Sequence, residues 1–327
     1  MKQIQRIGVY TSGGDAPGMN AAIRAVVRTA LYNNIKVTGI YRGYEGMIEG
    51  DFKEMVSRSV SSILQKGGTI LKSARCPEFR TPEGRKKAYD NVKEAGIDAL
   101  VAIGGDGTFT GADIFSKEYD IPVMCIPGTI DNDLYGSDYT LGFDTANNTV
   151  IDAIDKIKDT AASHNRLFFV EVMGRDSGCI ALNAGVAGGA EAILLPEKDT
   201  AIDELIDMLE TAKDQNKTSM IVIVAEGDKN GGAYHVAQRV NEKFDYFDTK
   251  VSILGHLQRG GSPSSFDRVL ATRMGYFAVN ELLKGNRSAT VGIRGSKIIS
   301  TTLEEALRGK EFKLDEELVT ISQVMNI

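Results

Sequence analysis

Tryptophan is absent from the sequence, and only three cysteines and three histidines occur among its 327 residues. Cys76, Cys125 and Cys179 lie far apart, and the histidines have no carboxylate partners at metal-ligand spacing. This pattern excludes a disulfide framework and argues against a zinc site. We interpret the cysteines as free core thiols and expect a cytoplasmic protein in a reducing compartment.

Long hydrophobic runs are also missing, since none approaches the roughly 20 apolar residues that span a bilayer. We expect neither a membrane partner nor a signal peptide, because the amino terminus passes directly into a strand pattern. The formal net charge of −6 argues against nucleic acid as a partner. A phosphorylated ligand would therefore need a local cluster of arginines to attract it.

Glycine, in contrast, is plentiful, with 35 residues against 7 prolines. The glycines are concentrated where strands are predicted to end. A hydrophobic content of 42% and a charged content of 25% are ordinary for a soluble globular protein. The length predicts two domains with sizeable cores.

Short runs rich in valine and isoleucine alternate with amphipathic stretches along the chain. Strands are expected at 6–11, 36–43, 98–105, 121–129, 166–174, 191–197 and 219–227, and helices at 17–32, 85–96, 141–164, 179–189 and 202–215. This alternation predicts α/β architecture, with mainly parallel sheets covered by helices on both faces and right-handed crossovers. Ligands of such sheets bind at the carboxyl ends of the strands.

The unusual residues of this sequence do stand directly after predicted strands. The segments are "TSGGDAPGMN", "GGDGT", "PGTIDND", "MGRDSG", "AEG" and "LGHLQRGG". In the first, Gly13 and Gly14 allow close approach of backbone N–H groups, and a helix begins near Pro17. This combination is typical of anion binding, although a tight strand-to-helix turn is an equally good interpretation.

The segment "GGDGT", residues 104–108, gives a sharper indication. Three glycines surround Asp106, which leaves the backbone bare against a polyphosphate and one carboxylate for Mg²⁺. The alternative is an acidic turn, but a turn needs only one glycine, so we favour the functional interpretation. The region matches neither GxxxxGK[ST] nor GxGxxG.

The segment "PGTIDND", residues 127–133, supplies a candidate base. Asp131, Asp133 and Thr129 could share the roles of phosphoryl transfer, which needs positioning, charge neutralisation and a base near the attacking hydroxyl. An Asx-rich turn explains the same residues equally well.

Arginines near the strand ends could supply the positive charge. Their planar guanidinium groups suit phosphate better than lysine does, and four of them stand in polar, glycine- or histidine-flanked contexts. These are Arg75, Arg166, Arg175 and Arg259. His256 could donate a hydrogen bond to a sugar hydroxyl, whereas His164 and His235 are given no functional role. The residues alone therefore predict a kinase acting on a phosphorylated small molecule, and the lack of a GxSxG segment leaves a serine hydrolase unsupported.

Seven segments in order resemble one family. They are "GVYTSGGDAPGMNAAIR", "GGTILKSARCPEFR", "AIGGDGT", "PGTIDND", "ASHNR", "EVMGR" and "LGHLQRGGSPSSFDR". Together they resemble the bacterial ATP-dependent 6-phosphofructokinases, over about residues 5–300. The resemblance implies transfer of a phosphoryl group from MgATP to fructose 6-phosphate, giving fructose 1,6-bisphosphate and ADP.

The resemblance also implies roles for individual residues. Asp131 matches the catalytic base, while Thr129 and Arg175 match groups that stabilise the transferring phosphoryl. The ATP site would comprise Gly14, Tyr44, Arg75, Cys76, Gly105, Asp106, Gly107 and Thr108, with Asp106 binding magnesium. The sugar-phosphate site would comprise Thr129, Ile130, Asp131, Arg166, Met173, Gly174, Arg175, Glu226, Lys250, His256, Leu257, Gln258 and Arg259.

Two positions bear on the phosphoryl donor. Pyrophosphate-dependent members of this family generally carry Asp and Lys where this chain has Gly107 and Gly128, so ATP is expected. At a third position Lys250 replaces an arginine that reaches the sugar phosphate from a neighbouring subunit, as Arg166 also would. Because lysine lacks the bidentate fork, we expect an altered affinity for fructose 6-phosphate.

An effector site is implied as well, for ADP or phosphoenolpyruvate. It would comprise Arg24, Arg28, Arg58, Lys158, Gly189, Ala190, Glu191 and Lys217. A solvated helix face remains the alternative interpretation of Arg24 and Arg28, which are four residues apart. Residues contributed by neighbouring subunits imply a homotetramer.

The resemblance implies two three-layer α/β/α domains with the active site in the cleft between them. The larger, ATP-binding domain would comprise 1–141 plus 257–305, and the smaller, fructose 6-phosphate-binding domain 142–256 plus 306–327. Alternatives that remain open are a pyrophosphate-dependent phosphofructokinase and a catalytically inactive nucleotide-binding regulatory subunit. A kinase of NAD is disfavoured because it would share only "GGDGT".

Overall fold

The computed structural model describes residues 4–161, 166–215, 217, 219–308 and 314–325. It divides into two compact units, each built from three stretches of chain. The first comprises Met1–Thr129, Leu134–Thr145 and Arg259–Glu311, and the second comprises Ile130–Asp133, Ala146–Gln258 and Phe312–Ile327. The expected domain boundaries at 141, 256 and 305 each lie within six residues of a boundary between these units, at 145, 258 and 311. The short segment Ile130–Asp133 belongs to the second unit.

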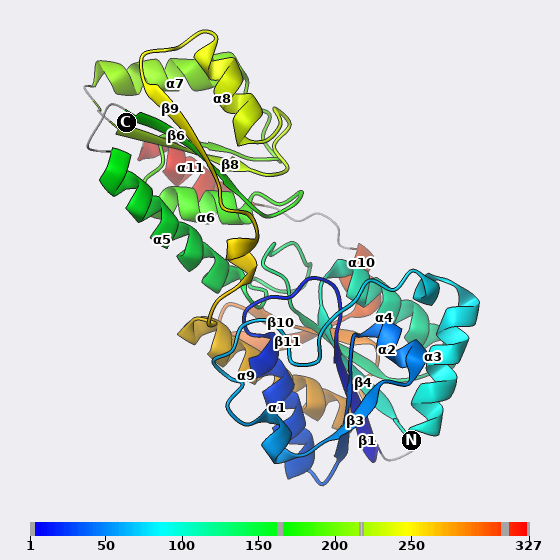
Figure 1. The fold of residues 1–327 in the computed structure, drawn as a ribbon. Helices are drawn as coiled ribbons and strands as arrows, with labels where there is room; N and C mark the ends of the chain where they lie inside the picture. The colour runs from blue at the N-terminus through cyan, green and yellow to red at the C-terminus, as the bar shows by residue number, and fades with distance from the viewer. Residues whose placement is uncertain (1–3, 162–165, 216, 218, 309–313, 326–327) are drawn as a thin grey trace. The chain divides into compact units, whose positions relative to one another are not determined.

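A seven-stranded sheet in the order β11-β10-β5-β4-β1-β2-β3 forms the centre of the first unit (Figure 1). The strands are β1 (Arg6–Thr11), β2 (Lys36–Ile40), β3 (Phe52–Met55), β4 (Ala99–Gly104), β5 (Val123–Pro127), β10 (Ala289–Arg294) and β11 (Lys297–Thr302). The five inner strands are parallel, and the two edge strands β3 and β11 are antiparallel to their neighbours. All six residues of β4 are buried, as expected for a parallel strand covered on both faces.

Helices cover both faces of this sheet. On one face α1 (Met19–Tyr32) packs along α9 (Ser265–Leu283). The other face carries α2 (Tyr44–Glu49), α3 (Pro82–Glu94), α4 (Asp106–Tyr119) and α10 (Leu303–Arg308). Two 3-10 helices, η1 (Ser57–Val60) and η2 (Glu78–Arg80), lie in the connections.

The second unit contains a four-stranded parallel sheet in the order β7-β8-β6-β9. Its strands are β6 (Arg166–Val172), β7 (Ala192–Leu194), β8 (Ser219–Ala225) and β9 (Asp248–Ile253). The helices α7 (Ile202–Asp214) and α8 (Ala233–Asn241) lie on one face, and α5 (Phe143–Ala161), α6 (Cys179–Ala187) and α11 (Glu316–Val324) on the other (Figure 1). A third 3-10 helix, η3 (Gly255–Arg259), follows β9.

The expected elements are present, with differences at their ends. The helix expected from residue 17 begins at Met19, because Gly18 has a φ of 102° that no helical residue adopts. The helix expected over 141–164 is seen from Phe143 to Ala161, and residues 162–164, with His164, lie outside the described residues. The strand expected over 191–197 shortens to Ala192–Leu194. None of the described helices is long and apolar enough to cross a membrane.

Candidate active site

Three loops meet at the carboxyl edge of the first unit's sheet, after β1, β4 and β5. The Ser12 N–H donates to the Ile103 carbonyl at 3.1 Å, and the Gly128 N–H donates to the Gly104 carbonyl at 2.9 Å. A Cβ at Gly104 would lie 2.4 Å from the Ser12 carbonyl oxygen. This close approach requires glycine, and it brings the "TSGGD", "GGDGT" and "PGT" segments side by side.

The "GGDGT" segment forms the start of α4. Gly105 is the N-cap residue and Asp106 the first helical residue, so the positive end of the helix dipole lies at the turn. Asp106 and Gly107 are exposed, and a Cβ at Gly107 would meet no atom within 4 Å. The space beside the turn is therefore open, as a phosphate-binding helix terminus requires.

Thr108 adds an unused polar group to this turn. Its side-chain hydroxyl is buried and has no hydrogen-bond partner within the described part of the chain. Two residues earlier in the same helical turn, Asp106 presents an exposed carboxylate, a hard oxygen ligand of the kind Mg²⁺ prefers. These two oxygen groups fit a magnesium–polyphosphate ligand. No group of three or more His, Cys, Asp or Glu side chains able to hold a metal occurs among the described residues.

Tyr44 supports the turn from inside the protein. Its ring is 7% exposed and stacks on Phe79, with centroids 3.9 Å apart. Its hydroxyl donates to the Thr108 carbonyl at 2.6 Å and accepts a hydrogen bond from the Tyr10 hydroxyl at 3.1 Å. Burial raises the pKa of Tyr44 well above its ordinary value, so the hydroxyl stays protonated. Tyr44 was expected in the ATP site, and the structure places it behind the "GGDGT" turn, in contact with the Thr108 carbonyl.

One of the predicted arginines, Arg259, contacts the first of these loops. Arg75 is exposed, and the neighbouring Cys76 is half-buried, which raises the pKa of its thiol. The Arg259 Nη1 donates to the Asp15 carbonyl at 3.3 Å and would lie 2.5 Å from a Cβ at Gly14. Gly14 is thus the residue that lets the Arg259 guanidinium lie over the first loop.

In the second unit, Asp131 and Arg175 form the ion pair of the site. Their Oδ2 and Nε atoms are 3.5 Å apart, with the Asp131 side chain 3% exposed and that of Arg175 64% exposed. Between Asp131 and Asp133, the buried Asn132 adopts a φ of 51°, a left-handed conformation that asparagine tolerates better than most residues. Sequence reasoning assigned Asn132 no role, although its residue type is the signal for such a turn.

The turn that presents Arg175 is held on several sides. The Glu226 Oε1 accepts hydrogen bonds from the N–H groups of Gly174, at 3.2 Å, and Arg175, at 2.7 Å. Arg175 has a φ of 53°, and a Cβ at Gly227 would lie 2.0 Å from its carbonyl oxygen. The Glu226 carboxylate therefore fixes a strained backbone that aims the exposed guanidinium.

Gln258 also holds this turn in place. Its side chain is fully buried; the Oε1 accepts from the Met173 N–H at 3.1 Å, and the Nε2 donates to the Gly255 carbonyl at 3.0 Å. Gln258 was expected to contact the sugar phosphate. Its two hydrogen bonds join the 173–175 turn to η3, on which His256 and Leu257 are exposed, and its contact with the sugar phosphate stays a prediction.

The two remaining cations predicted for the sugar phosphate lie on neighbouring strands. Lys250 on β9 contacts the Asp248 Oδ1 at 2.6 Å, and Arg166 on β6 contacts the Asp248 Oδ2 at 3.5 Å. The hydrogen bond from Lys250 lowers the pKa of Asp248 below its ordinary value, with Arg166 adding to the effect. One carboxylate thus holds both cations on the same side of the sheet.

The residues predicted for an effector site fall into two groups. In the first unit, Arg24 and Arg28 lie one turn apart on α1, and partial burial together with the charge of Arg28 lowers the pKa of Arg24. Arg58 is on η1, which packs against α1. In the second unit, Lys217 forms an ion pair with Glu191 at 3.2 Å, and the Lys158 Nζ is 3.5 Å from the Gly189 carbonyl. Each group is assembled within its own unit.

Comparisons with known proteins point in one direction. A family model described as Phosphofructokinase matches residues 6–282. Over the full length of both chains, the sequence is 53% identical to a Bacteroides thetaiotaomicron protein named ATP-dependent 6-phosphofructokinase 2. It is 52% identical over 99% of this chain and 98% of the ATP-dependent 6-phosphofructokinase of Cytophaga hutchinsonii. The structure matches a phosphofructokinase from Saccharomyces cerevisiae with a TM-score of 0.90 and 38% identity, covering 98% of this chain and 47% of the yeast chain.

Proposed function

The chain belongs to the phosphofructokinase family, and we propose that it transfers the γ-phosphoryl group of MgATP to the 1-hydroxyl of D-fructose 6-phosphate. The products are fructose 1,6-bisphosphate and ADP. The observation that carries the proposal is the ion pair of Asp131 and Arg175, a buried carboxylate beside an exposed guanidinium. Such a pair supplies a base and a phosphoryl-stabilising cation at one place.

In the proposed mechanism Asp131 takes the proton of the sugar hydroxyl as that oxygen attacks the phosphoryl group. Arg175 is free to contact the transferring group because its side chain is 64% exposed and its backbone is fixed by Glu226. Thr129 lies two residues before Asp131 in the same segment, with its carbonyl accepting from the Thr140 hydroxyl at 2.6 Å. We assign Thr129 to the same phosphoryl group.

The nucleotide would bind at the first unit's glycine loops, with its phosphates at the N-terminus of α4. Asp106, aided by the Thr108 hydroxyl, would hold Mg²⁺, which neutralises charge on the phosphates. Arg75 would contact the nucleotide directly, while Tyr44 acts through the turn that it supports.

Two glycines favour ATP as the donor. The open space at Gly107 leaves room for the inner phosphates of a nucleotide, which an aspartate would crowd and repel. A Cβ at Gly128 would lie 2.9 Å from the Met19 Cε and 3.1 Å from the Ile103 Cγ2. A lysine at position 128 would therefore require repacking of the core beneath the site.

The test measures fructose 1,6-bisphosphate formation with MgATP and, separately, with pyrophosphate. We expect turnover with MgATP that falls by orders of magnitude in Asp131→Asn, and a nearly unchanged rate in Asp176→Asn, an exposed acid next to Arg175. Turnover with pyrophosphate alone would overturn the donor assignment. A folded protein with no turnover on either donor would favour a regulatory subunit.

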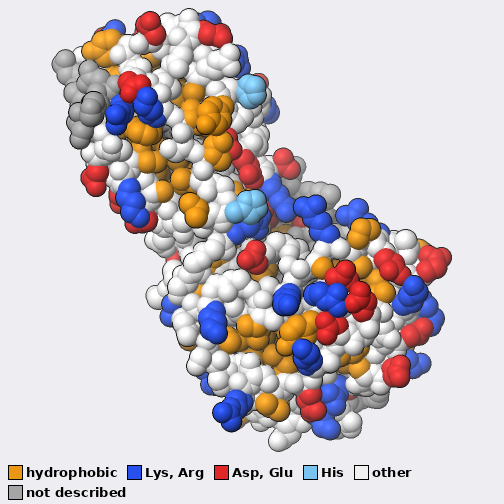
Figure 2. Space-filling model, in the orientation of Figure 1, with side chains coloured by type: hydrophobic (Ala, Val, Ile, Leu, Met, Phe, Trp, Pro, Cys, Tyr) orange, Lys and Arg blue, Asp and Glu red, His pale blue; other side chains and the backbone are white. Residues whose placement is uncertain are grey.

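Quaternary structure and regulation complete the proposal. We infer a cytoplasmic homotetramer in which Arg166 and Lys250 complete a neighbouring subunit's sugar-phosphate site. In its support, β9 is an edge strand with Ile253 51% exposed, and apolar side chains gather on the surface around it (Figure 2). ADP or phosphoenolpyruvate would bind at the arginines of α1 and η1 and at the Gly189–Glu191 loop. Unchanged kinetics with either effector at subsaturating fructose 6-phosphate would refute this regulation.

A further inference from the structure

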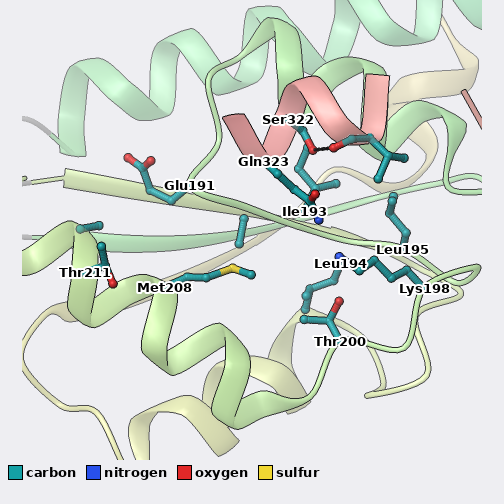
Figure 3. Close-up of a pocket in the computed structure, with 13 residues that line it drawn as sticks. Glu191, Ile193, Leu194, Leu195, Lys198, Thr200, Met208, Thr211, Ser322 and Gln323 are labelled. Atoms are coloured by element: carbon teal, nitrogen blue, oxygen red, sulfur yellow. Dashed lines mark hydrogen bonds between the residues drawn. The ribbon is translucent and has the colours of Figure 1, made fainter. Parts of the chain in front are cut away.

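A cavity of about 210 Å³ lies in the second unit, between β7, α7 and α11. Its lining contains none of the residues assigned to catalysis or to the sugar phosphate, and it shares only Glu191 with the residues predicted for the effector site. Its walls are largely apolar, and the side chains that form them include Ile193, Leu195, Met208 and Val319 (Figure 3). A cavity of this kind accommodates a small ligand that buries an apolar body.

Three hydrogen-bond donors point into the same space. Figure 3 shows the Lys198 amine, the Thr200 hydroxyl and the Gln323 amide nitrogen directed toward the centre, from the loop after β7 and from α11. Among the residues that the structure describes, Lys198 has no carboxylate within ion-pair distance, so its charge is not neutralised by them. The one acid of the lining, Glu191, stands at the far end and is paired with Lys217 at 3.2 Å.

The backbone of β7 adds further polar groups. This strand is at the edge of its sheet and pairs only with β8 among the described strands. The Glu191 N–H, just before β7, donates to the Ile221 carbonyl on β8. Because the direction of these groups alternates along a strand, those of Ala192 and Leu194 turn to the free side, along which the cavity runs.

We propose that this cavity binds a small monocarboxylate with a branched or short apolar chain. The carboxylate would accept hydrogen bonds from Lys198, Thr200 and Gln323, and the apolar chain would lie against Met208 and Ile193. A single ammonium with two neutral donors matches one negative charge. A phosphoryl group would call for the arginine forks that this cavity lacks in its described lining.

Two probes of equal shape test the charge requirement. Isothermal titration calorimetry compares 4-methylpentanoate with its neutral amide, 4-methylpentanamide. We expect the acid to bind one per chain and about tenfold or more tightly than the amide, because only the acid forms charge-assisted hydrogen bonds. Equal affinities, or no binding of the acid, would overturn the proposal.

Variants and a local probe tie the binding to this cavity. Lys198→Met should weaken acid binding by about tenfold or more, whereas Lys156→Met, an exposed lysine of α5 in the same unit, should leave it unchanged. Should Lys198→Met fail to fold, Val319→Phe fills the cavity from the surface helix α11 and should abolish binding. With methyl-labelled methionine, the acid should shift the Met208 resonance, assigned by Met208→Leu. Binding that survives both variants, or that leaves Met208 unshifted, would contradict the assignment.

Discussion

At the scale of single residues, two buried side chains support the backbone of the candidate site. Gln258 is fully buried and connects the Met173 N–H with the Gly255 carbonyl. Tyr44 connects the aromatic core with the Thr108 carbonyl. Each side chain fixes the backbone behind an exposed group, Arg175 in one case and Asp106 in the other. Such residues set the geometry of the site and contribute little to its surface.

Replacing Gln258 with methionine should test this positioning role. The isosteric thioether keeps the volume and removes both hydrogen bonds, which leaves the buried Met173 N–H unpaired at a cost of roughly 1–3 kcal/mol. We expect the KM for fructose 6-phosphate to rise about tenfold or more, with the KM for MgATP nearly unchanged. Gln238→Met, an exposed glutamine of α8, is the control. An equal rise in both KM values would indicate general destabilisation instead.

Asp228 carries a second prediction at this scale. It is 6% exposed; its Oδ1 accepts from the Asn230 N–H, and its Oδ2 has no hydrogen-bond partner within the described residues. Burial raises the pKa of this carboxyl; the Asp199 charge adds to the shift, while Asn230 and Lys229 oppose it. A carboxyl whose pKa is higher in the folded than in the unfolded state stabilises the protein at low pH. That stability is lost as the pH rises through the folded-state value.

Asp228→Asn removes this titration. The difference in Tm between variant and wild type should therefore grow in the variant's favour as the pH rises from about 4, the ordinary carboxyl range. Thermal unfolding at several pH values between acid and neutral measures it. A difference that stays flat or shrinks with rising pH would contradict the assigned direction of the pKa shift.

At the scale of elements, helix termini anchor the loops of the site. The Ser264 hydroxyl accepts from the Asp267 N–H at 3.2 Å and donates to the Asp144 Oδ2 at 2.5 Å. The buried Asp267 carboxylate in turn accepts from the N–H groups of Gly142 and Thr145, both at 2.9 Å. The first turn of α9 therefore caps the start of α5, the helix that follows the segment carrying Asp131.

Ser264→Ala should remove one N-cap and one interhelical hydrogen bond. The expected loss is about 1–2 kcal/mol of unfolding free energy, measured by denaturant titration. Ser265→Ala, one residue into the same helix and exposed, changes the same atoms without a cap and should lie within roughly 0.5 kcal/mol of wild type. Equal losses in both variants would show that the hydroxyl of Ser264 has no capping role.

Sequence patterns predicted these elements better than their surroundings. The all-apolar β4 and the glycines of the "GGDGT" turn are local signals, and both the strand and the bare turn are confirmed. The antiparallel edge strands β3 and β11 were not anticipated, because edge pairing depends on residues distant in the sequence. The burial of Gln258 was missed for the same reason, since its partner Met173 is 85 residues away. The sequence alone does not show whether a polar residue of such a motif faces a ligand or the core.

At the scale of the whole molecule, the proposed sharing of sites between subunits can be tested by mixing two different variant chains in one oligomer. Arg166 and Lys250 lie beside Asp248 at the β6–β9 side of the second unit's sheet, and Asp131 lies in a different stretch of that unit. If Arg166 completes a neighbour's site, a chain carrying Arg166→Ala still has an intact Asp131. A chain carrying Asp131→Asn still has an intact Arg166.

Coexpression of the two inactive variants should therefore restore activity. In a mixed pair of subunits, one site combines the intact Asp131 with the partner's intact Arg166, while the other site lacks both. With random pairing half of the pairs are mixed and one site in two is intact, so about a quarter of wild-type activity is expected. Each variant alone should stay inactive, and the activity of the separately expressed variants sets the background. Failure to restore activity in verified mixed oligomers would place Arg166 in the site of its own chain.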